Sequence, residues 1–514
     1  MSPLLALVCL AGLLMVLLYL SGVRRRRPGE HPLVRGWIPY FGKTFEFSRD
    51  GQSFLKRLQE EHGDIFTVLI AGRYLTFVMD PHVYPVIERH GKHLNFQAFA
   101  MQVSAACFGH PRSDHPTLGV PTEEISNSYR YMQGSELESM IESTTKHLHR
   151  VIIRSVQDVK GAISGDENCN GTNGWKTGSL NEFCLATTFE AVWVTLFGST
   201  NVDWLDQEFS TKLLEHFVPY DKAVPLLAAN VPISLLRSSR HHRAQLATLL
   251  TPSSLSRLKD RSSVVAARTE VINSNGNLDD RQKAAYHLHF LWGSMSNTLQ
   301  SIFWSIYHLL LHPDAQRAVN AEVTAFLEET GQSPRLGSPL RLGCHQLDSM
   351  VALGSAVTES LRLTASTLTI RVAQKDIAMP LPNHGTLRLR QGDWLTLPPY
   401  TSLHLNPDVF QEPQTYRYDR FMEGGKPRKT FYKDGRPLRH ALMPFGFGAT
   451  KCPGRFFALL VDKAFLVLLL SHVEIELCPG QVPVEADVSR GPFGVLPPKG
   501  DVQFRYRPRP GLAE

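Results

Sequence analysis

A single cysteine in a glycine-rich stretch is the residue of this chain best suited to metal chemistry. Cys452 lies within residues 445–454, FGFGATKCPG, just before an apolar run. Glycines let a backbone approach a flat ligand closely, and a thiolate at the start of a helix is stabilised by free N–H groups and by the helix dipole. Because no partner cysteine lies nearby, the pattern favours a haem iron over zinc or an iron–sulfur cluster. The competing interpretation is a buried structural cysteine in a glycine turn.

Small polar residues interrupt a long buried helix that the sequence predicts over residues 287–311. They are Ser294, Ser296, Asn297 and Thr298. Polar groups inside a buried helix either bond back to its carbonyls or face a wet cavity. Asn297 has no proton to release, but its carboxamide can orient water or a substrate hydroxyl.

A carboxylate and a guanidinium are spaced three residues apart on another predicted helix. Glu359 and Arg362 face the same way on that helix. The pair alone is weak, since exposed ion pairs contribute little to stability. Arg420 follows in Tyr418-Asp419-Arg420-Phe421, before the cysteine loop.

Taken together, these patterns resemble the cytochrome P-450 monooxygenases over nearly the whole chain. The cysteine loop is similar to that family's haem-thiolate loop, Phe-Gly-x-Gly-x-x-x-Cys-x-Gly. The resemblance implies a haem b cofactor with Cys452 as the axial iron ligand, and with Arg371, Phe445 and Gly446 also at the haem. Arg371 would hold a haem propionate, because an arginine fork suits a carboxylate.

The same resemblance assigns roles to the other patterns. Glu359, Arg362 and Arg420 would form a structural core beneath the haem. Asn297 and Thr298 would be catalytic, standing where the family has an acid–alcohol pair that delivers protons to dioxygen. Electrons would come from NADPH through an NADPH–haemoprotein reductase.

Departures from the general family pattern narrow the resemblance to its sterol 7α-hydroxylase branch. Thr450 replaces the usual Arg or His of the cysteine loop, and Asn297 replaces the acid of the central helix. The oxysterol 7α-hydroxylases are the most similar, which implies sterol metabolism and bile acid synthesis. Cholesterol 7α-hydroxylation, sterol 12α-hydroxylation, or an isomerase like prostacyclin synthase that needs no reductase remain alternatives. Candidate substrate contacts, from their positions relative to the motifs, are Trp292, Asn297, Ser366 and Leu496.

The N-terminus predicts a membrane attachment. Residues 1–23 are almost wholly apolar, and the run Arg24 to Arg27 follows them. Positive charge after the apolar run predicts a retained anchor with the downstream chain in the cytosol, as in a single-pass protein of the endoplasmic reticulum membrane. We expect an anchor over 1–23, a basic and proline-containing linker over 24–36 and one catalytic domain over 37–514.

Bulk composition supports a large globular domain. The chain has 514 residues, 43% of them hydrophobic and 20% charged, with a net charge of +6. Its basic residues are scattered, which argues against nucleic acid. Seven cysteines, an odd number without a CxxC pair, argue against a disulfide scaffold.

Periodicity predicts a mainly α fold with small β-sheets. Helical patterns dominate residues 135–330, and a hairpin is expected from strands 65–70 and 74–79 around a glycine turn. Short strands are expected within 384–400 and 473–507. A cluster of basic residues upstream of the cysteine loop would suit an acidic reductase, although a solvated loop fits equally well. The cluster comprises Lys426, Arg428, Lys429, Lys433, Arg436 and Arg439.

Overall fold

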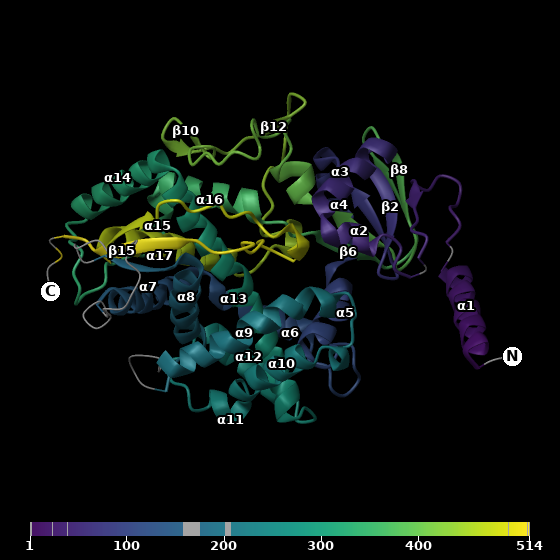
Figure 1. Ribbon diagram of the computed structural model, residues 1–514, viewed down its shortest axis with the longest axis horizontal. Helices are drawn as coiled ribbons and strands as arrows, with labels where there is room; N and C mark the ends of the chain where they lie inside the picture. Colours follow the sequence, from purple (N-terminus) through teal and green to yellow (C-terminus); the bar gives the residue numbers. More distant parts are fainter. Residues whose placement is uncertain are drawn as a thin grey trace.

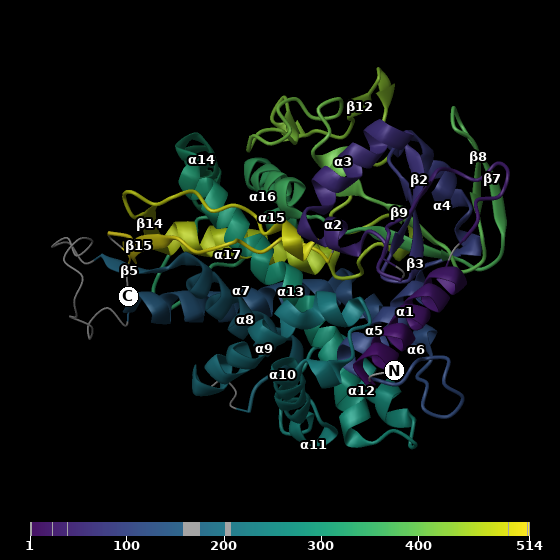
Figure 2. The same cartoon turned by 45° about the vertical axis from the view of Figure 1, so that its right-hand side comes forward.

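A body of long helices carries a β-sheet at one end (Figure 1). This computed structural model describes residues 3–22, 24–38, 40–157, 175–200, 207–491, 493–510 and 512. Figure 2 shows the same division from a second direction. The sheet of β2 (Ile65–Ile70), β3 (Arg73–Val78) and β9 (Trp394–Leu397) lies on one side, and β14 (Val473–Leu477) and β15 (Gln503–Pro508) lie at the far end. The predicted fold class, mainly helical with small sheets, is confirmed.

The helical body forms around one central helix. Helix α13 packs against helices on several sides, and their apolar faces make one continuous core. The main helices of this body are α5 (Phe96–Phe108), α7 (Gly134–Gln157), α8 (Leu180–Phe197), α9 (Gln207–Ala228), α10 (Arg237–Leu249), α12 (Ser263–Ser274), α13 (Asp280–Leu311), α14 (Pro313–Glu329), α16 (Val351–Thr364) and α17 (Arg455–His472).

Local sequence signals set the limits of the central helix. Asp279 and Gln282 form a capping box that begins α13, seven residues before the predicted start at His287. No proline interrupts the helix, and it ends at Leu311 because Pro313 opens α14. Most of its residues are buried, as expected for a helix surrounded by others.

The main sheet has six strands in the order β1-β2-β3-β9-β6-β4. The predicted hairpin is confirmed, because β2 and β3 pair antiparallel from Ile65 with Val78 to Ile70 with Arg73. Short strands in the two predicted C-terminal regions are also present. The strands concerned are β1 (Leu33–Val34), β2 (Ile65–Ile70), β3 (Arg73–Val78), β4 (Leu94–Asn95), β6 (Thr369–Ala373), β8 (Gly385–Leu389), β9 (Trp394–Leu397), β14 (Val473–Leu477) and β15 (Gln503–Pro508).

The N-terminal apolar segment forms helix α1 (Pro3–Gly22). In Figure 1 this helix extends beyond the sheet end of the molecule. Large apolar side chains along it are exposed, including Leu7 and Leu10 at 69% each. Across the described parts of the chain, no helix reaches the length and apolar character of a membrane span.

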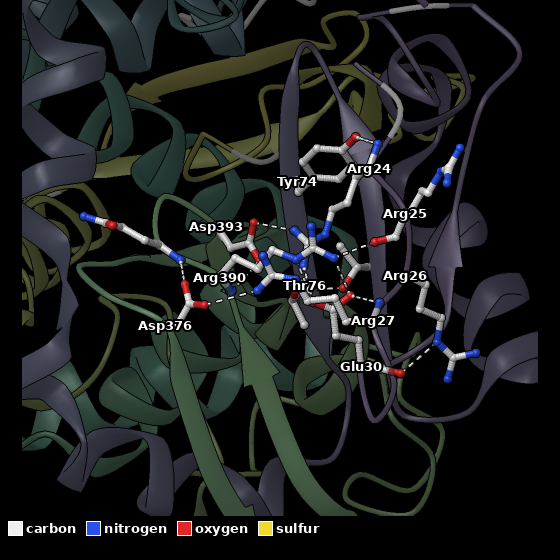
Figure 3. Close-up of polar contacts among 12 residues, drawn as sticks. Arg24, Arg25, Arg26, Arg27, Glu30, Tyr74, Thr76, Asp376, Arg390 and Asp393 are labelled. Carbon is white, nitrogen blue, oxygen red and sulfur yellow. Dashed lines mark hydrogen bonds and ion pairs between the residues drawn. The ribbon is translucent and has the colours of Figure 1, made fainter. Parts of the chain in front are cut away.

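The basic segment after α1 docks onto the sheet through buried ion pairs (Figure 3). Arg24 contacts Asp393 at 2.6 Å, and Arg390 contacts Glu30 at 2.7 Å. The side chains of Arg24, Glu30 and Asp393 are each less than a tenth exposed. Tyr74 of β3 accepts a hydrogen bond from the Arg24 backbone. The segment predicted as a linker is therefore fixed to the β-sheet end of the molecule at its beginning.

Glu30 gives this docked segment a pH-dependent stability. Burial disfavours its charge, but hydrogen bonds from Arg390 and from the Arg27 backbone, together with the charge of Arg24, outweigh burial and lower the pKa of Glu30 to about 2. A carboxyl with a lowered pKa stabilises the fold above its ordinary pKa of 4.5, and this contribution is lost as the pH falls through about 2.

Replacing Glu30 with glutamine is therefore expected to destabilise the protein by about 2 kcal/mol at neutral pH, the usual scale for hydrogen bonds to a charged group. The deficit should shrink as the pH falls from 4.5 toward 2, and thermal unfolding at a series of pH values measures it. Glu485→Gln is the control, because its pair with Lys499 is mostly exposed. A deficit that stays constant down to acid pH would contradict the assignment.

Candidate haem-thiolate site

A glycine-rich turn presents Cys452 just ahead of α17. The Cys452 N–H donates to the Phe445 carbonyl at 2.9 Å, which closes the loop on itself. Gly446 and Gly448 have φ angles of 73° and 64°, in the left-handed region that favours glycine. The loop shape that places Cys452 therefore depends on these two positions.

The Cys452 thiol is accessible to solvent but crowded by protein atoms. Desolvation raises its pKa, while the Gly454 N–H and the positive charge of Arg455 favour the thiolate. A Cβ atom at Gly454 would lie 3.4 Å from Met132 and 3.9 Å from the Cys452 sulfur. Glycine at 454 thus leaves room beside the sulfur, as an axial ligand to a flat cofactor requires.

Arg371 on β6 reaches the cysteine loop. Its guanidinium donates to the Thr450 hydroxyl and, at 2.8 Å, to the Ile370 carbonyl. The aromatic rings of Phe96 and Phe447 flank it. In the described parts of the chain no carboxylate pairs with Arg371, and desolvation lowers its pKa to about 10. A desolvated guanidinium without an acidic partner fits the carboxylate of a bound group such as a haem propionate.

Glu359, Arg362 and Arg420 lie together as a buried charge cluster. Arg362 binds both carboxylate oxygens of Glu359, at 2.7 and 2.8 Å, and Arg420 binds one of them at 2.9 Å. Arg362 also donates to the carbonyls of His404 and Pro413, both at 2.6 Å. The cluster thus ties α16 to the irregular chain that leads to the cysteine loop.

The polar side chains of the central helix mostly form hydrogen bonds with other protein groups. Ser294 and Thr298 donate to the carbonyls four residues earlier, at 2.6 and 2.8 Å. The Asn297 carboxamide oxygen accepts from the Val495 N–H at 2.8 Å, which leaves its amino group as the part able to donate elsewhere. Beside them Gly293 is exposed although it lies midway along a buried helix, and a Cβ there would meet no atom within 4 Å. This face of α13 therefore borders open space.

The predicted substrate contacts do not all line the same cavity. Trp292 donates its indole N–H to Asp221 at 2.7 Å. Ser366 is buried and donates to the Gly494 carbonyl, and Leu496 is buried with its carbonyl bonded to Trp304. Ser366 and Leu496 line a cavity together, whereas Trp292 does not border it.

Two residues that sequence reasoning missed lie next to Trp292. Asp221 on α9 and Arg490 near the C-terminus form an ion pair at 2.7 Å. They are 269 positions apart in the chain, and neither belongs to a recognisable motif. Only the folded chain brings them together.

The predicted basic cluster stays exposed. Five of its residues, Lys426, Arg428, Lys429, Arg436 and Arg439, are exposed, and Lys433 is partly buried against Asp434 at 2.8 Å. They lie on the short hairpins formed by β10 (Met422–Glu423), β11 (Lys426–Pro427), β12 (Tyr432–Lys433) and β13 (Arg436–Pro437), on the outer face of the molecule (Figure 1).

A cysteine loop ahead of a helix, an arginine on a nearby strand that contacts this loop, and a long central helix are the features expected of a haem-thiolate protein. Residues 32–504 match the family Cytochrome P450, and the chain belongs to that family. Membership implies haem b, dioxygen and electrons from a reductase.

Particular relatives place the chain among sterol-related members. It is 35% identical to cytochrome P450 7B1 of Mus musculus, over 98% of this chain and 96% of the relative. Identity is also 35% to the cholesterol 7-alpha-monooxygenase of Cricetulus griseus, over 94% of each chain. Prostacyclin synthase of Rattus norvegicus is 35% identical over 94% of this chain and 95% of its own. The predicted resemblance to the sterol 7α-hydroxylase branch is confirmed.

Proposed function

We propose that this protein is a membrane-bound monooxygenase that hydroxylates oxysterols at the 7α position, in sterol metabolism and bile acid synthesis. The observation that carries the haem-thiolate part of the proposal is the contact between Arg371 and the cysteine loop at Thr450. It brings a desolvated cation, which has no acidic partner among the described residues, and an accessible thiol to neighbouring positions of one site. The similarity to 7α-hydroxylating relatives supports the substrate class.

The residues of the site would have different roles around a bound haem. Cys452 would ligate the iron, Arg371 would hold a propionate, and Phe445 and Gly446 would shape the loop against the ring. The cofactor, when bound, supplies the activation of dioxygen. The protein holds the sterol, excludes bulk water and positions protons near the open face of α13.

Thr298 is the proposed proton-positioning residue. Its hydroxyl donates to the Ser294 carbonyl, yet its oxygen can still accept a hydrogen bond from water. Asn297 cannot supply a proton, so we propose that these two residues order water instead of forming an acid–alcohol relay.

Thr298→Ala is expected to reduce the hydroxylated product formed per NADPH by about tenfold, because the water that its hydroxyl oxygen would hold in place for proton transfer loses its position. Product and NADPH consumption are measured together in the reconstituted system. Thr358→Ala is a matched control, since Thr358 on α16 makes the same backward bond, to the Gly354 carbonyl. Unchanged coupling in Thr298→Ala would contradict the proposed role.

The delivery of electrons and the attachment to a membrane would each involve a surface outside the haem-thiolate site. We propose that the exposed basic hairpins dock an acidic reductase, which opposite charge would steer. Helix α1, with its exposed leucines, is proposed to attach the protein to the endoplasmic reticulum membrane. A sterol dissolved in that membrane would then lie near the protein that consumes it.

An isomerase like prostacyclin synthase is the second candidate. It is favoured by Asn297, which lacks a proton to deliver, and by Thr298, whose hydroxyl is bonded within its own helix. Such an enzyme would need neither NADPH nor a reductase.

Product analysis by mass spectrometry after reconstitution with reductase separates these functions. A side-chain hydroxycholesterol, cholesterol and a prostaglandin endoperoxide are each supplied with and without NADPH. We expect NADPH-dependent 7α-hydroxylation of the oxysterol in preference to cholesterol. A 12α product or a preference for cholesterol would move the assignment to another sterol hydroxylase, and endoperoxide rearrangement without NADPH would replace it with an isomerase.

A further inference from the structure

One carboxylate joins three elements that surround the open face of the central helix. Asp221 on α9 accepts hydrogen bonds from Trp292 at 2.7 Å and from Ser296 at 3.0 Å, both on α13. Its other oxygen accepts from Arg490 at 2.7 Å, and Arg490 also donates to the Asp221 carbonyl at 2.9 Å. Both side chains of the ion pair are more than four-fifths buried. Asp221 therefore has partners both on α13 and in the C-terminal loop, whose described residues are 488–491 and 493–497.

The first part of the C-terminal loop is hydrogen-bonded to α9 through Asp221. Further along the loop, the backbone of Gly494, Val495 and Leu496 is bonded to Ser366, Asn297 and Thr364. By contrast, the short turn Val488–Arg490 is tied to other elements by Arg490, the one residue of that turn with such hydrogen bonds in the described part of the chain. Loss of the Asp221 carboxylate would thus weaken the attachment of this turn to α9, whereas its packing against α2 (Thr44–Arg49) and α3 (Gly51–His62) and the bonds of the second half of the loop would remain.

The C-terminal loop lines two separate cavities. Val488, Gly491 and Leu496 line the cavity that also contains Ser366. On its other side, the loop borders a smaller pocket beside α9 and α13, lined by Asp221, Ser296, Gln300, Arg490, Phe493, Val495 and Pro497. Movement of the loop would change the access to both.

Helix α9 is weakened on either side of Asp221. Pro219 and Pro225 both lie inside this helix. An internal proline removes a backbone hydrogen bond and clashes with the preceding turn, so it is a common site of kinking. Asp221 therefore lies on a stretch of helix that can bend at low cost, between two interrupted turns.

We propose that Asp221 is a positioning residue whose carboxylate latches α9 and the C-terminal loop onto the central helix, and that this latch opens when a sterol enters or leaves. The inference rests on the proposed function for the identity of the ligand. A charge pair excluded from most solvent holds the closed arrangement, and the proline-interrupted helix allows the open one. In this arrangement, the main role of Trp292 and Ser296 is to bind Asp221 and so hold α9 against α13, rather than to contact the sterol.

The test measures how fast a sterol binds to and leaves the holoenzyme. Stopped-flow absorbance follows the haem spectrum as a side-chain hydroxycholesterol is mixed with the protein or displaced from it. In Asp221→Asn and Arg490→Gln we expect the dissociation rate to rise about tenfold, because breaking a desolvated charge pair acts mainly on dissociation. Arg490→Lys keeps the charge but loses the two-nitrogen contact, so its dissociation rate should rise less than that of Arg490→Gln, which is the partial rescue expected of a latch.

A matched ion pair provides the control. Arg154 and Glu190 join α7 to α8 through two hydrogen bonds, at 3.1 and 2.6 Å, away from Asp221 and Arg490. Glu190→Gln should leave both sterol rates unchanged even where it lowers thermal stability. The ferrous carbonyl spectrum and the unfolding midpoint of each variant establish that it is folded and loaded.

Each outcome has one meaning. Unchanged dissociation rates in folded Arg490→Gln and Asp221→Asn, or equal changes in Glu190→Gln, would overturn the latch. If Asp221→Asn gives no holoenzyme, Arg490→Gln and the double variant Trp292→Phe/Ser296→Ala decide the question alone. A wild-type holoenzyme that responds to an endoperoxide but to no sterol would instead overturn the proposed function.

Discussion

Replacing Cys452 with serine is expected to abolish NADPH-dependent hydroxylation. Burial raises the pKa of the Cys452 thiol, but metal binding removes a thiol's proton, whereas a serine hydroxyl cannot supply a comparable anion near neutral pH. Because the electron donation that favours oxygen cleavage comes from that sulfur, we expect a rate at least about a thousandfold lower.

Two measurements check this result. The ferrous carbonyl spectrum should lose the signature of thiolate ligation, and product formation should fall below detection. Cys9→Ser is the control, because Cys9 is an exposed thiol on α1. A Cys452→Ser protein that retained both the spectrum and turnover would show that another residue holds the iron.

The second large effect is expected on stability, at Glu359. This carboxylate is fully buried and receives three hydrogen bonds from Arg362 and Arg420 and another from the Arg417 backbone at 3.1 Å. Glutamine removes the charge and leaves two buried guanidinium groups without a counter-ion. Breaking a buried ion pair in this way costs about 3–5 kcal/mol.

Glu359→Gln should therefore accumulate little folded holoenzyme and unfold at a markedly lower temperature. Midpoints are compared at one heating rate, since large proteins often unfold irreversibly. Glu46→Gln is the control, because Glu46 pairs with Arg57 at a site about half exposed and should change stability by less than about 1 kcal/mol. A Glu359→Gln protein as stable as the control would contradict the structural role assigned to the cluster.

Local patterns in the sequence anticipated much of the architecture. The β2–β3 hairpin follows from alternating apolar residues around a glycine turn, and the central helix from an apolar run without proline. The start of that helix was placed too late because the capping box at Asp279 and Gln282 precedes the apolar run. Its signal was present in the sequence, but it consists of polar residues.

Contacts between distant segments could not be predicted in this way. Asp221 and Arg490 carry no motif, and ordinary charged residues of this kind are usually exposed. The bond between Asn297 and the Val495 backbone likewise depends on Gly494, where a Cβ would lie 1.8 Å from the Asn297 oxygen. Sequence periodicity places Asn297 on its helix, but only the packed loop determines which of its atoms remain free for a ligand.

The docked N-terminal segment has a mechanical consequence. Only residue 23 separates the end of α1 at Gly22 from Arg24, whose side chain is held by Asp393. One residue of chain spans no more than about 3.6 Å, so this tether has almost no slack. The C-terminal end of α1 is therefore held close to Asp393, the residue that precedes β9. On a surface that binds α1, the rest of the protein would have a restricted range of orientations. Breaking the contact of Arg24 with Asp393 would widen that range.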